Sequence, residues 1–483
     1  MSSNRSGLSI ADRWMASVAF LAILAATWLR GGTHPAWSWP LLWISLVGLL
    51  SLPVACVWSS RIRREPFSGA PVLRWKDPVL WFGLILIALL AVQWWNAGRI
   101  LYYDPAARAW AYSAPRHPAL PSAITSLESR QMLDWFVPAF VLLILLRSPS
   151  FSARGVRLLW RLVVCSAAVL SVFGLLQFLS GTEKMFGFIP MRPHFFASFG
   201  YPNHAGSYFL IAMCLCAALL VHELSRPDAI RRGRMVLLSV CFVLCLLGAN
   251  FALSRASILA SWFLLLPIGL LVLRAVWFRL GPAQRVNMIA LSLAAVVLAM
   301  ILTFGLGQEA IRTEFKPEDD NKTLLTRETD FRIFQIESAA RIWRDHPWYG
   351  VGGWGYRYLM AHYLPPEQWQ RVTEGKANVH NDPIQFLAEF GLIGGGAMAA
   401  VVLVLGVEAW RRRAGAPPLL LLPLMGVGIV GLQSLIDLPF RSPAVLMLWL
   451  CAFAGAIRLV PIRPILLNAE PCNDMVRRTE VAT

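Results

Sequence analysis

The sequence predicts an all-α polytopic membrane protein, and its composition, hydropathy and charge placement each support that fold class. Hydrophobic residues make up 57% of the 483 positions, charged residues only 15%, and the mean hydropathy is +0.57. Soluble globular proteins are far less apolar. The formal net charge of +17 comes from basic residues in short clusters between apolar runs. Membrane proteins carry such clusters in their cytoplasmic loops, so we interpret the charge as topology and expect no nucleic acid partner.

Each membrane-spanning helix needs about 20 predominantly apolar residues, and about twelve runs of this kind can be recognised. The segment 236–276 has the length of about two crossings, so we expect it to fold back at its polar break, SRAS at 254–257. The predicted spans lie at 14–29, 37–57, 79–95, 132–146, 158–179, 205–222, 236–253, 258–276, 288–306, 384–407, 419–438 and 444–457.

Basic clusters follow every second span and predict the topology. The positive-inside rule assigns them to the cytoplasm, and both termini are expected on the same side. We therefore divide the chain into N-terminal membrane helices at 1–197, a membrane core at 198–460 and a polar cytoplasmic tail at 461–483. The clusters contain Arg61, Arg63, Arg64, Arg74 and Lys76; Arg147, Arg154 and Arg157; Arg226, Arg231, Arg232 and Arg234; Arg274, Arg279 and Arg285; and Arg411, Arg412 and Arg413.

The opposite side carries a large loop, 307–383, which is too polar to cross the membrane and too long for a bare connector. Long loops on a rigid scaffold often carry function. The middle of this loop, 331–343, is amphipathic, with Phe334 and Ile342 among its apolar residues and Arg332 among its basic ones. We expect it to form a helix that lies on the membrane surface.

The stretch VHNDPIQFLAEFGLIG, at 379–394, combines polar residues with the start of a predicted span. Asp382 suits the N-cap and Pro383 the first helical position, so a helix should begin at Pro383. His380 then stands beside the positive end of a membrane-entering helix, which attracts anions such as phosphate. We identify His380 as a candidate proton acceptor and Asn381 as a secondary candidate. The alternative is an ordinary interfacial histidine.

Two arginines are expected at membrane depth on the side that the positive-inside rule disfavours. Arg255 lies in the hairpin ALSRASIL, and Arg441 lies in DLPFRSPA between the last two spans. A planar guanidinium suits phosphate, so both are candidates for an anion site. Snorkelling to the lipid headgroups is the alternative for each.

A second polar group is expected at the mouth of another helix. The stretch SFGYPNHAGSYF places Asn203 and His204 there. They are secondary site candidates, although helix capping by Asn203 is an equally good interpretation. The glycines of GVGGWG, at 350–355, lack the lysine and serine of a phosphate-binding loop, so we interpret them as a turn. No metal site and no cofactor is predicted.

The sequence RIFQIESAARIWRDHPWYGVGGWGY, followed by HNDPIQFLAEFGLIG, resembles the paired signature of the O-antigen ligase and O-antigen polymerase superfamily. The segments LSRAS and SFGYPNHAG resemble two further family segments, so the likeness covers roughly 198–444. Many relatives carry an arginine immediately before the Asn-His pair, where this chain has Tyr201-Pro202.

The resemblance implies a glycosyltransferase at the periplasmic face of the bacterial cytoplasmic (inner) membrane. Its donor would be a glycan on polyprenyl (undecaprenyl) diphosphate, and its acceptor a hydroxyl of another glycan or of lipid A-core, in O-antigen, lipopolysaccharide or exopolysaccharide assembly. His380 would deprotonate the acceptor. Arg255 and Arg332, with Arg441 a weaker candidate, would stabilise the departing diphosphate without a metal.

Two other functions are compatible with a polytopic protein that contacts membrane lipids. A transporter of lipid-linked glycans would often show two related halves with polar residues at mid-membrane depth. Here the polar residues gather at helix mouths and no halves repeat, which favours surface chemistry. A non-catalytic envelope-assembly scaffold would use the loop 307–383 for docking, and loss of activity on a change of His380 alone would distinguish an enzyme from it.

Overall fold

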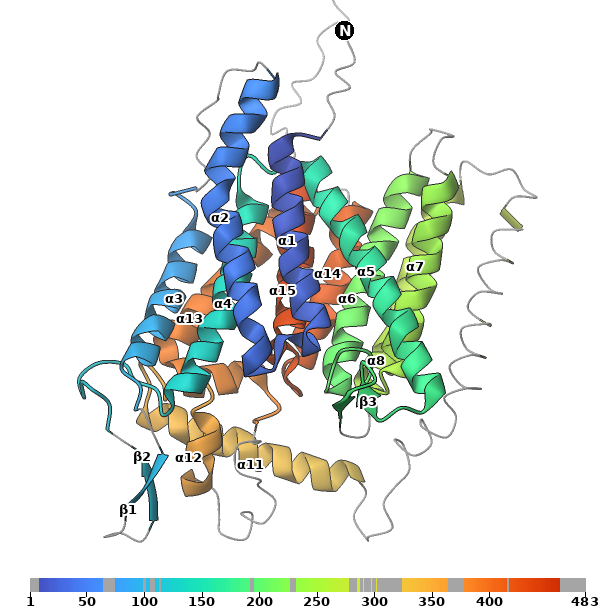
Figure 1. The fold of residues 1–483 in the computed structure, drawn as a ribbon. Coiled ribbons are helices and arrows are strands. Elements are labelled where there is room, and N and C mark those ends of the chain that lie inside the picture. Colours follow the sequence, from blue (N-terminus) through green and yellow to red (C-terminus); the bar gives the residue numbers. More distant parts are fainter. Residues whose placement is uncertain are drawn as a thin grey trace, which may run out of the picture.

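The computed structural model describes residues 8–63, 74–98, 101–104, 109–112, 114–191, 195–225, 232–277, 324–363, 378–414 and 417–460, with isolated positions between 285 and 301. Over these residues the protein is a helical bundle with two short strand hairpins (Figure 1). The hairpins pair β1 (Leu101–Asp104) with β2 (Ala109–Tyr112) and β3 (Lys184–Met185) with β4 (Ile189–Pro190), both antiparallel.

Within the described ranges, nine helices are long and apolar enough to cross a membrane, and two shorter apolar helices accompany them. Every predicted span except 288–306, which lies outside the described residues apart from isolated positions, coincides with one of these helices. The fold class is therefore confirmed, whereas the count of about twelve remains a prediction. The helices are α1 (Ile10–Trp28), α2 (Pro35–Arg63), α3 (Pro78–Trp95), α4 (Ser126–Arg147), α5 (Ala153–Ser180), α6 (Pro202–Leu224), α7 (Arg232–Phe251), α8 (Arg255–Trp277), α13 (Asp382–Arg411), α14 (Pro418–Gln433) and α15 (Pro443–Leu459).

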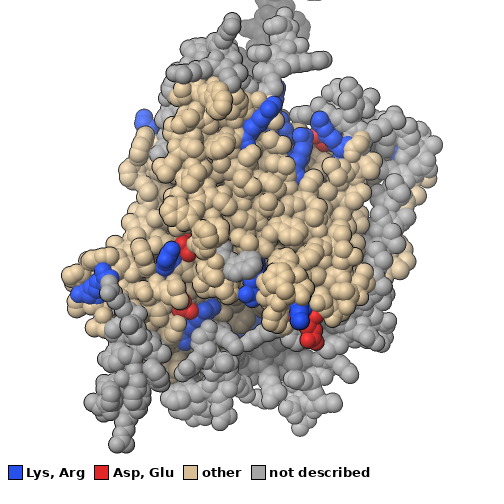
Figure 2. All heavy atoms as spheres, viewed as in Figure 1, with Lys and Arg blue, Asp and Glu red and all other residues tan. Residues whose placement is uncertain are grey.

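The ends of the membrane helices follow from local sequence. The Asp77 carboxylate accepts a hydrogen bond from Val79 N at 3.1 Å, and Pro78 opens α3. Helix α5 ends at Gly181, whose φ of +63° most side chains avoid. Figure 2 shows the charged side chains gathered at the two ends of the bundle, with an uncharged band between them. Such a band is what a bilayer-crossing protein presents to lipid.

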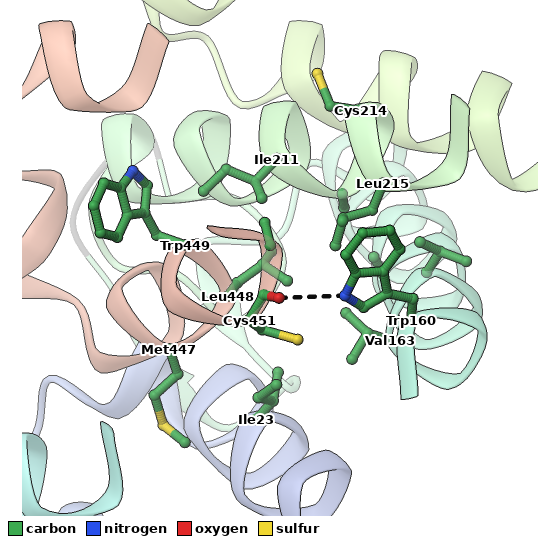
Figure 3. Close-up of a cluster of buried hydrophobic side chains, with 14 of the residues drawn as sticks. Ile23, Trp160, Val163, Ile211, Cys214, Leu215, Met447, Leu448, Trp449 and Cys451 are labelled. Atoms are coloured by element: carbon green, nitrogen blue, oxygen red, sulfur yellow. Dashed lines mark hydrogen bonds between the residues drawn. The ribbon is translucent and has the colours of Figure 1, made fainter. Parts of the chain in front are cut away.

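The core is built around α6 and α15. Helix α6 is almost entirely buried, and it packs on α5, α7, α8, α14 and α15. Figure 3 shows where α5 meets α15: the indole of Trp160 donates a hydrogen bond to Cys451 O at 3.3 Å. Ile23, Ile211 and Leu448 are among the apolar side chains of this core, which fixes the helix ends on which the site is built.

Helix α11 (Leu324–Asp345) lies across one face of the bundle, called the site face below, and α12 (Tyr356–Tyr363) lies beside it (Figure 1). The amphipathic helix predicted at 331–343 is thus present and longer. Its apolar residues Phe334 and Ile342 pack with Tyr356 and Val379, so this face covers protein. The described helix ends that carry the predicted basic clusters lie on the opposite face.

Helix α13 is broken at Gly391, whose φ and ψ are 62° and −166°. The glycine-rich turn that follows α11 fills the break. Val351 N and Gly352 N donate to the carbonyls of Ala388 and Glu389, at 3.0 and 2.8 Å. Leu392 N and Ile393 N donate in return to the carbonyls of Pro347 and Trp348, at 2.8 and 3.1 Å. The interpretation of GVGGWG as a turn is confirmed, and the turn supplies the hydrogen bonds that the broken helix lacks.

The predicted span 419–438 is too long. Helix α14 ends at Gln433, and the chain continues through the short 3-10 helix η4 (Pro439–Arg441) into α15. Leu438 precedes Pro439, and the residue before a proline is biased away from helical angles. The helix therefore does not continue to Leu438. The connection 434–442 carries Asp437 and Arg441, which are both buried beneath the site face.

Candidate functional site

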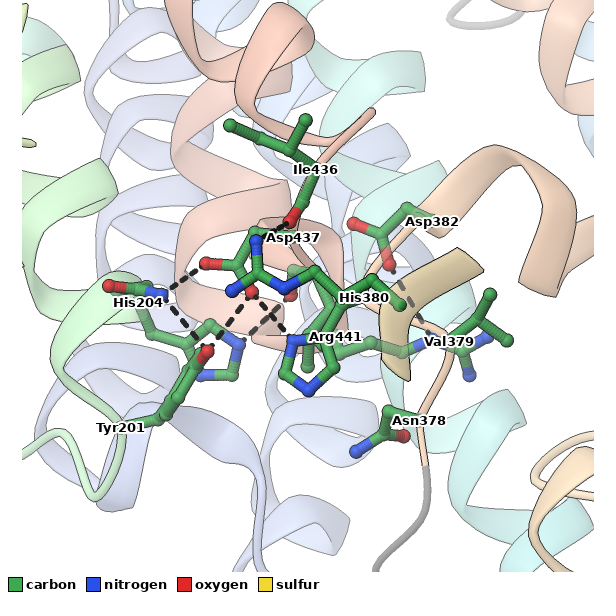
Figure 4. A network of polar contacts seen from close by, with 12 residues as sticks. Tyr201, His204, Asn378, Val379, His380, Asp382, Ile436, Asp437 and Arg441 are labelled. Carbon is green, nitrogen blue, oxygen red and sulfur yellow. Dashed lines mark hydrogen bonds and ion pairs between the residues drawn. The ribbon is translucent and has the colours of Figure 1, made fainter. Parts of the chain in front are cut away.

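Four segments that are far apart in the sequence meet at the C-terminal end of α14, and Figure 4 labels residues of three of them. They are the first turn of α6, the middle of α11, the residues just before α13 and the connection 434–442. The structure thereby brings together His380, Asn203, His204 and Arg332 from the predicted site. It also adds Asp437, around which the others are arranged.

Asp437 accepts hydrogen bonds from three side chains. The Tyr201 hydroxyl donates to Oδ1 at 3.0 Å, Asn203 Nδ2 donates to Oδ2, and His380 Nδ1 lies 3.4 Å from Oδ1. Asn203 Nδ2 also lies 2.9 Å from the Tyr201 hydroxyl, which joins the two donors. A buried carboxylate with this many donors is held in one orientation.

His380 is positioned by its backbone as well as by Asp437. Its φ is +53°, an uncommon angle for a residue with a side chain, and its side chain is 30% exposed. A carboxylate accepts hydrogen bonds but cannot donate them, so contact with ionised Asp437 requires the proton on Nδ1. In the neutral imidazole Nε2 then carries the lone pair and can accept a proton.

The acid–base properties of the cluster follow from burial and from the charge of Asp437. Burial and the neighbouring Asp437 carboxylate raise the pKa of the Tyr201 phenol, so Tyr201 stays a hydrogen-bond donor. Burial alone would raise the pKa of Asp437. The hydrogen bond from His380, the charges that His380 and His204 carry when protonated and a backbone hydrogen bond at Leu438 together outweigh burial and hold that pKa below the ordinary aspartate value. Asp437 therefore stays ionised beside His380.

The arginines occupy different surroundings. Arg332 of α11 donates to Ile436 O at 3.1 Å, which places its guanidinium next to Asp437. Arg255 opens α8, at the turn from α7. That turn abuts the first turns of α6, because a Cβ at Gly206 would come within 2.0 Å of Ser257 Oγ. Arg255 and Asn203 thus belong to segments that pack together at the same end of the bundle.

Arg441 lies inside the protein and away from solvent. Its side chain is 1% exposed, and Nη1 donates to Glu389 Oε2 at 2.8 Å. Asp382 Oδ1 lies 3.7 Å from Arg441 Nε, and the Trp354 ring centroid lies 4.8 Å from the guanidinium carbon. The predicted anion-site arginine therefore already faces two buried carboxylates.

The secondary candidates have clear local partners. Asn381, and not Asp382 as predicted, is the N-cap of α13, because its Oδ1 accepts from Ile384 N at 3.1 Å. Asp382 instead accepts from Phe440 N at 2.8 Å, which ties α13 to the connection 434–442. His204 Nε2 lies 3.0 Å from Leu438 O. Asn203 does not cap α6, since Tyr201 holds that position and the Asn203 amide bonds to Asp437.

Asp437 and Tyr201 are site residues that the sequence did not predict. The position of Asp437, at the end of an apolar run, could have identified it. Ionisable residues at membrane depth are rare and usually functional. Among the described residues, no group of three or more His, Cys, Asp or Glu side chains could hold a metal ion.

Comparison with known families gives one result. Residues 240–399 match a family model described as O-antigen ligase. The matched segment contains Arg255, Arg332 and His380, whereas Asn203 and Asp437 lie outside it. No curated protein matches the chain.

Proposed function

We propose that this chain, whose residues 240–399 match a family model described as O-antigen ligase, acts as a member of the O-antigen ligase and O-antigen polymerase superfamily and transfers a glycan from a polyprenyl diphosphate donor to an acceptor hydroxyl. In this proposal the site face is the periplasmic side of a bacterial cytoplasmic membrane, and both termini are cytoplasmic. The acceptor is a glycan or lipid A-core, and the product serves O-antigen, lipopolysaccharide or exopolysaccharide assembly.

His380 is the general base of the proposed reaction. As the acceptor oxygen attacks the anomeric carbon of the donor, Nε2 takes the hydroxyl proton. A glycosidic bond forms, the bond between that carbon and the diphosphate oxygen breaks, and polyprenyl diphosphate departs with the electron pair. Asp437 holds the proton on Nδ1 and stabilises the imidazolium that results.

Arg255 and Arg332 are the proposed diphosphate ligands. Positioned cations stabilise the charge that develops on a leaving group. For Arg332, this role is supported by its position beside the His380–Asp437 pair. For Arg255, it is supported by the packing of the turn before α8 on α6. Arg441 is not a proposed diphosphate ligand, because its guanidinium is buried against Glu389 and Asp382.

The contact of His380 with Asp437 is the observation that supports the proposal best. A non-catalytic scaffold has no need of a histidine whose tautomer is fixed by a buried carboxylate, and a proton-coupled transporter would carry such a pair near the middle of the membrane and not at the end of a helix. Tyr201 and Asn203 hold the Asp437 carboxylate, Asp437 contacts Nδ1 of His380, and Nε2 is left to accept the proton. This arrangement serves proton transfer.

We expect His380→Ala to lower glycan transfer by about 10²–10⁴-fold, the usual contribution of a general base. The measurement is transfer in the host, with protein abundance checked by immunoblot and polyprenyl diphosphate-linked glycans analysed by mass spectrometry. His362→Ala, an exposed histidine on α12, is the matched control. Stranded long chains would identify a ligase, and stranded single repeat units a polymerase. Full transfer by His380→Ala would overturn the proposal and favour the transporter or the scaffold.

A further inference from the structure

A pocket of about 270 Å³ lies at the end of the bundle opposite the site face, where α6, α13 and α15 end and α14 begins (Figure 1). Arg411 and Arg412, at the end of α13, line it together with His222 of α6. Its volume falls just below the range of drug-sized ligand sites, about 300–1,000 Å³, so it suits a small chemical group. The pocket thus combines basic side chains with room for a small anion.

Arg412 is a largely buried cation with a donor that the protein does not use. Its side chain is only 16% exposed, and Nη1 donates to the backbone and carboxylate oxygens of Glu408, at 2.9 and 3.5 Å. Its Nε is buried and has no hydrogen-bond partner among the described residues. Buried polar groups nearly always have a partner, so this donor indicates an acceptor from outside the chain.

The acids near the pocket do not balance its cations. Glu408 is shared between Arg412 and Arg147 of α4, whose Nη2 lies 2.6 Å from Glu408 Oε1. Glu223 of α6 is buried, and its Oε1 lies 2.5 Å from Nη2 of Arg161. Both carboxylates are therefore engaged by arginines outside the pocket, which leaves an excess of positive charge within it.

The acid–base properties of Arg412 reflect this excess. Burial lowers the pKa of its guanidinium, and the neighbouring cations Arg147 and Arg411 lower it further. The charge of Glu408 opposes these effects without cancelling them. Like charges held this close repel one another, and a bound anion would relieve the repulsion.

An arginine at the end of a membrane helix can serve topology alone, and Arg413 is an example. It is exposed, its guanidinium carbon lies 3.5 Å from the Trp410 ring centroid, and it does not line the pocket. Arg412, the preceding residue, is instead turned into the protein. Burial of a cation costs free energy unless the cation is paired, so topology does not account for its position.

We propose that this pocket binds a phosphate group between Arg411 and Arg412, carried by an anionic phospholipid or free in solution. The planar guanidinium offers phosphate several donors at once. Basic pockets between the ends of membrane helices suit anionic headgroups. The remaining wall includes Val221, Leu419 and Leu459, which would contact the glycerol and first methylenes of a lipid.

A phosphate in this pocket would hold together the ends of α6, α13 and α14. The opposite ends of the same three helices carry Asn203, His380 and Asp437. An anion bound at one end of the bundle would therefore stabilise the packing of the helices that build the candidate site at the other. The inference does not rest on the proposed function, because the pocket and its charges carry it alone.

The test compares three variants of the full chain purified in a neutral detergent. Arg411→Gln and Arg412→Gln each remove one charge from the pocket. Arg413→Gln is the matched control, because it removes the same charge from the neighbouring position outside the pocket. Each protein is titrated with phosphatidylglycerol, with phosphatidylcholine of the same chain length and with inorganic phosphate. The rise in Tm gives the affinity, since a ligand of the folded state stabilises it.

We expect a phosphate-bearing anion to raise the Tm of the unmodified protein and of Arg413→Gln alike. Binding to Arg411→Gln and to Arg412→Gln should be about fivefold weaker, the usual effect of one basic residue near an anionic headgroup. A response to phosphatidylglycerol but not to inorganic phosphate would identify a lipid as the source. A similar affinity for inorganic phosphate would identify a soluble anion.

Three results would overturn the assignment of the pocket. They are no response to either anion, an equal response to phosphatidylcholine and phosphatidylglycerol, and equal affinities in Arg411→Gln and Arg413→Gln. Arg411 is exposed, so Arg411→Gln keeps the test decisive even if Arg412→Gln, which loses its contact with Glu408, fails to fold. Glycan transfer that depends on His380 is measured separately, so the proposed function stands or falls independently of these results.

Discussion

The His380 imidazole has two nitrogen atoms, and the contact that one of them makes decides what the other can do. Nδ1 lies 3.4 Å from Asp437 Oδ1, to which the Tyr201 hydroxyl also donates, and Asn203 donates to the other oxygen, Oδ2. The neighbouring histidine, His204, is bound through Nε2 to Leu438 O. Of these two histidines, His380 is therefore the one with Nε2 available for proton transfer.

Asp437→Asn tests whether Asp437 keeps the proton of the His380 imidazole on Nδ1. The amide can present its N–H to Nδ1 and so favour the wrong tautomer, so we expect transfer to fall at least about tenfold, toward the 10²–10⁴-fold of a lost base. Transfer is measured with the purified enzyme and a lipid-linked donor, with Asp345→Asn on α11 as the control. Unchanged turnover in Asp437→Asn would remove Asp437 from the mechanism.

The pH dependence of stability follows from the same residue. The folded state holds the pKa of Asp437 below its unfolded value of about 3.9, so the ionised carboxylate stabilises the fold above that pH. This contribution is lost as the pH falls through the folded pKa. The Tm of the unmodified protein should therefore exceed that of Asp437→Asn at about pH 5, and this margin should shrink in more acid solution. A margin that grows in acid would contradict the sign of the shift.

At the scale of elements, the break in α13 decides how its first turns approach the site. The chain reverses after α11 and lays its glycine-rich turn into the break, where four backbone hydrogen bonds join the two segments. Gln93 of α3 adds a hydrogen bond to Tyr349 O at 2.7 Å. Helices α11 and α13 are thereby joined as one unit, which carries Arg332 on α11 and His380 just before α13.

Gly391→Ala should loosen this unit. The backbone angles at Gly391 belong to a region that is essentially restricted to glycine, and strain there costs about 1–3 kcal/mol. The added Cβ would also come within 2.3 Å of the Trp348 carbonyl carbon. Gly396→Ala lies on the same helix in open space and should instead stabilise it by about 0.5–1 kcal/mol. Thermal unfolding in detergent compares the two, and equal Tm values would contradict the role of the break.

At the scale of the whole molecule, the site is held together by charges that bridge distant helices. Arg441 joins the start of α15 to Glu389 at the break of α13, and Asp382 joins α13 to the same connection through Phe440 N. Gln385 donates to Glu389 at 2.9 Å and accepts from Val379 N at 3.0 Å, next to His380. Val379 and Phe440, which this network holds, are close in sequence to His380 and Asp437, so the network helps to set the distance between those two residues.

A double-mutant cycle measures the coupling between Arg441 and Glu389. Arg441→Met leaves Glu389 buried without its cation, and loss of one partner of a buried pair costs about 3–5 kcal/mol. Combining Arg441→Met with Glu389→Gln removes both charges, so we expect the double variant to be more stable than Arg441→Met alone. Unfolding in detergent gives the three values. Strict additivity of the two single changes would show that the pair is not coupled.

The helices could be predicted from the sequence, because the length of an apolar run is a local property. The position of His380 just before the N-terminus of a membrane helix could be predicted in the same way. The partners of these residues could not. Asp437 lies 57 residues from His380 and 234 from Asn203, and no local pattern records which helix ends meet. Arg441 was assigned to an anion site because of its depth, yet Glu389, 52 residues earlier, occupies its guanidinium. The His380 base and the Arg255 and Arg332 ligands remain proposals that the geometry supports.

The shortness of α14 has a consequence for the choice of nucleophile. Its 16 residues rise about 24 Å, less than the hydrocarbon thickness of about 30 Å, so the segment beyond it lies below the level that longer helices reach. An activated sugar is open to hydrolysis wherever bulk water can reach its anomeric carbon. The His380 side chain is 30% exposed, so in the proposed reaction a bound acceptor must displace water from the base before its hydroxyl can react. Exclusion of that water by the acceptor would keep the energy of the proposed diphosphate linkage from being lost as free glycan.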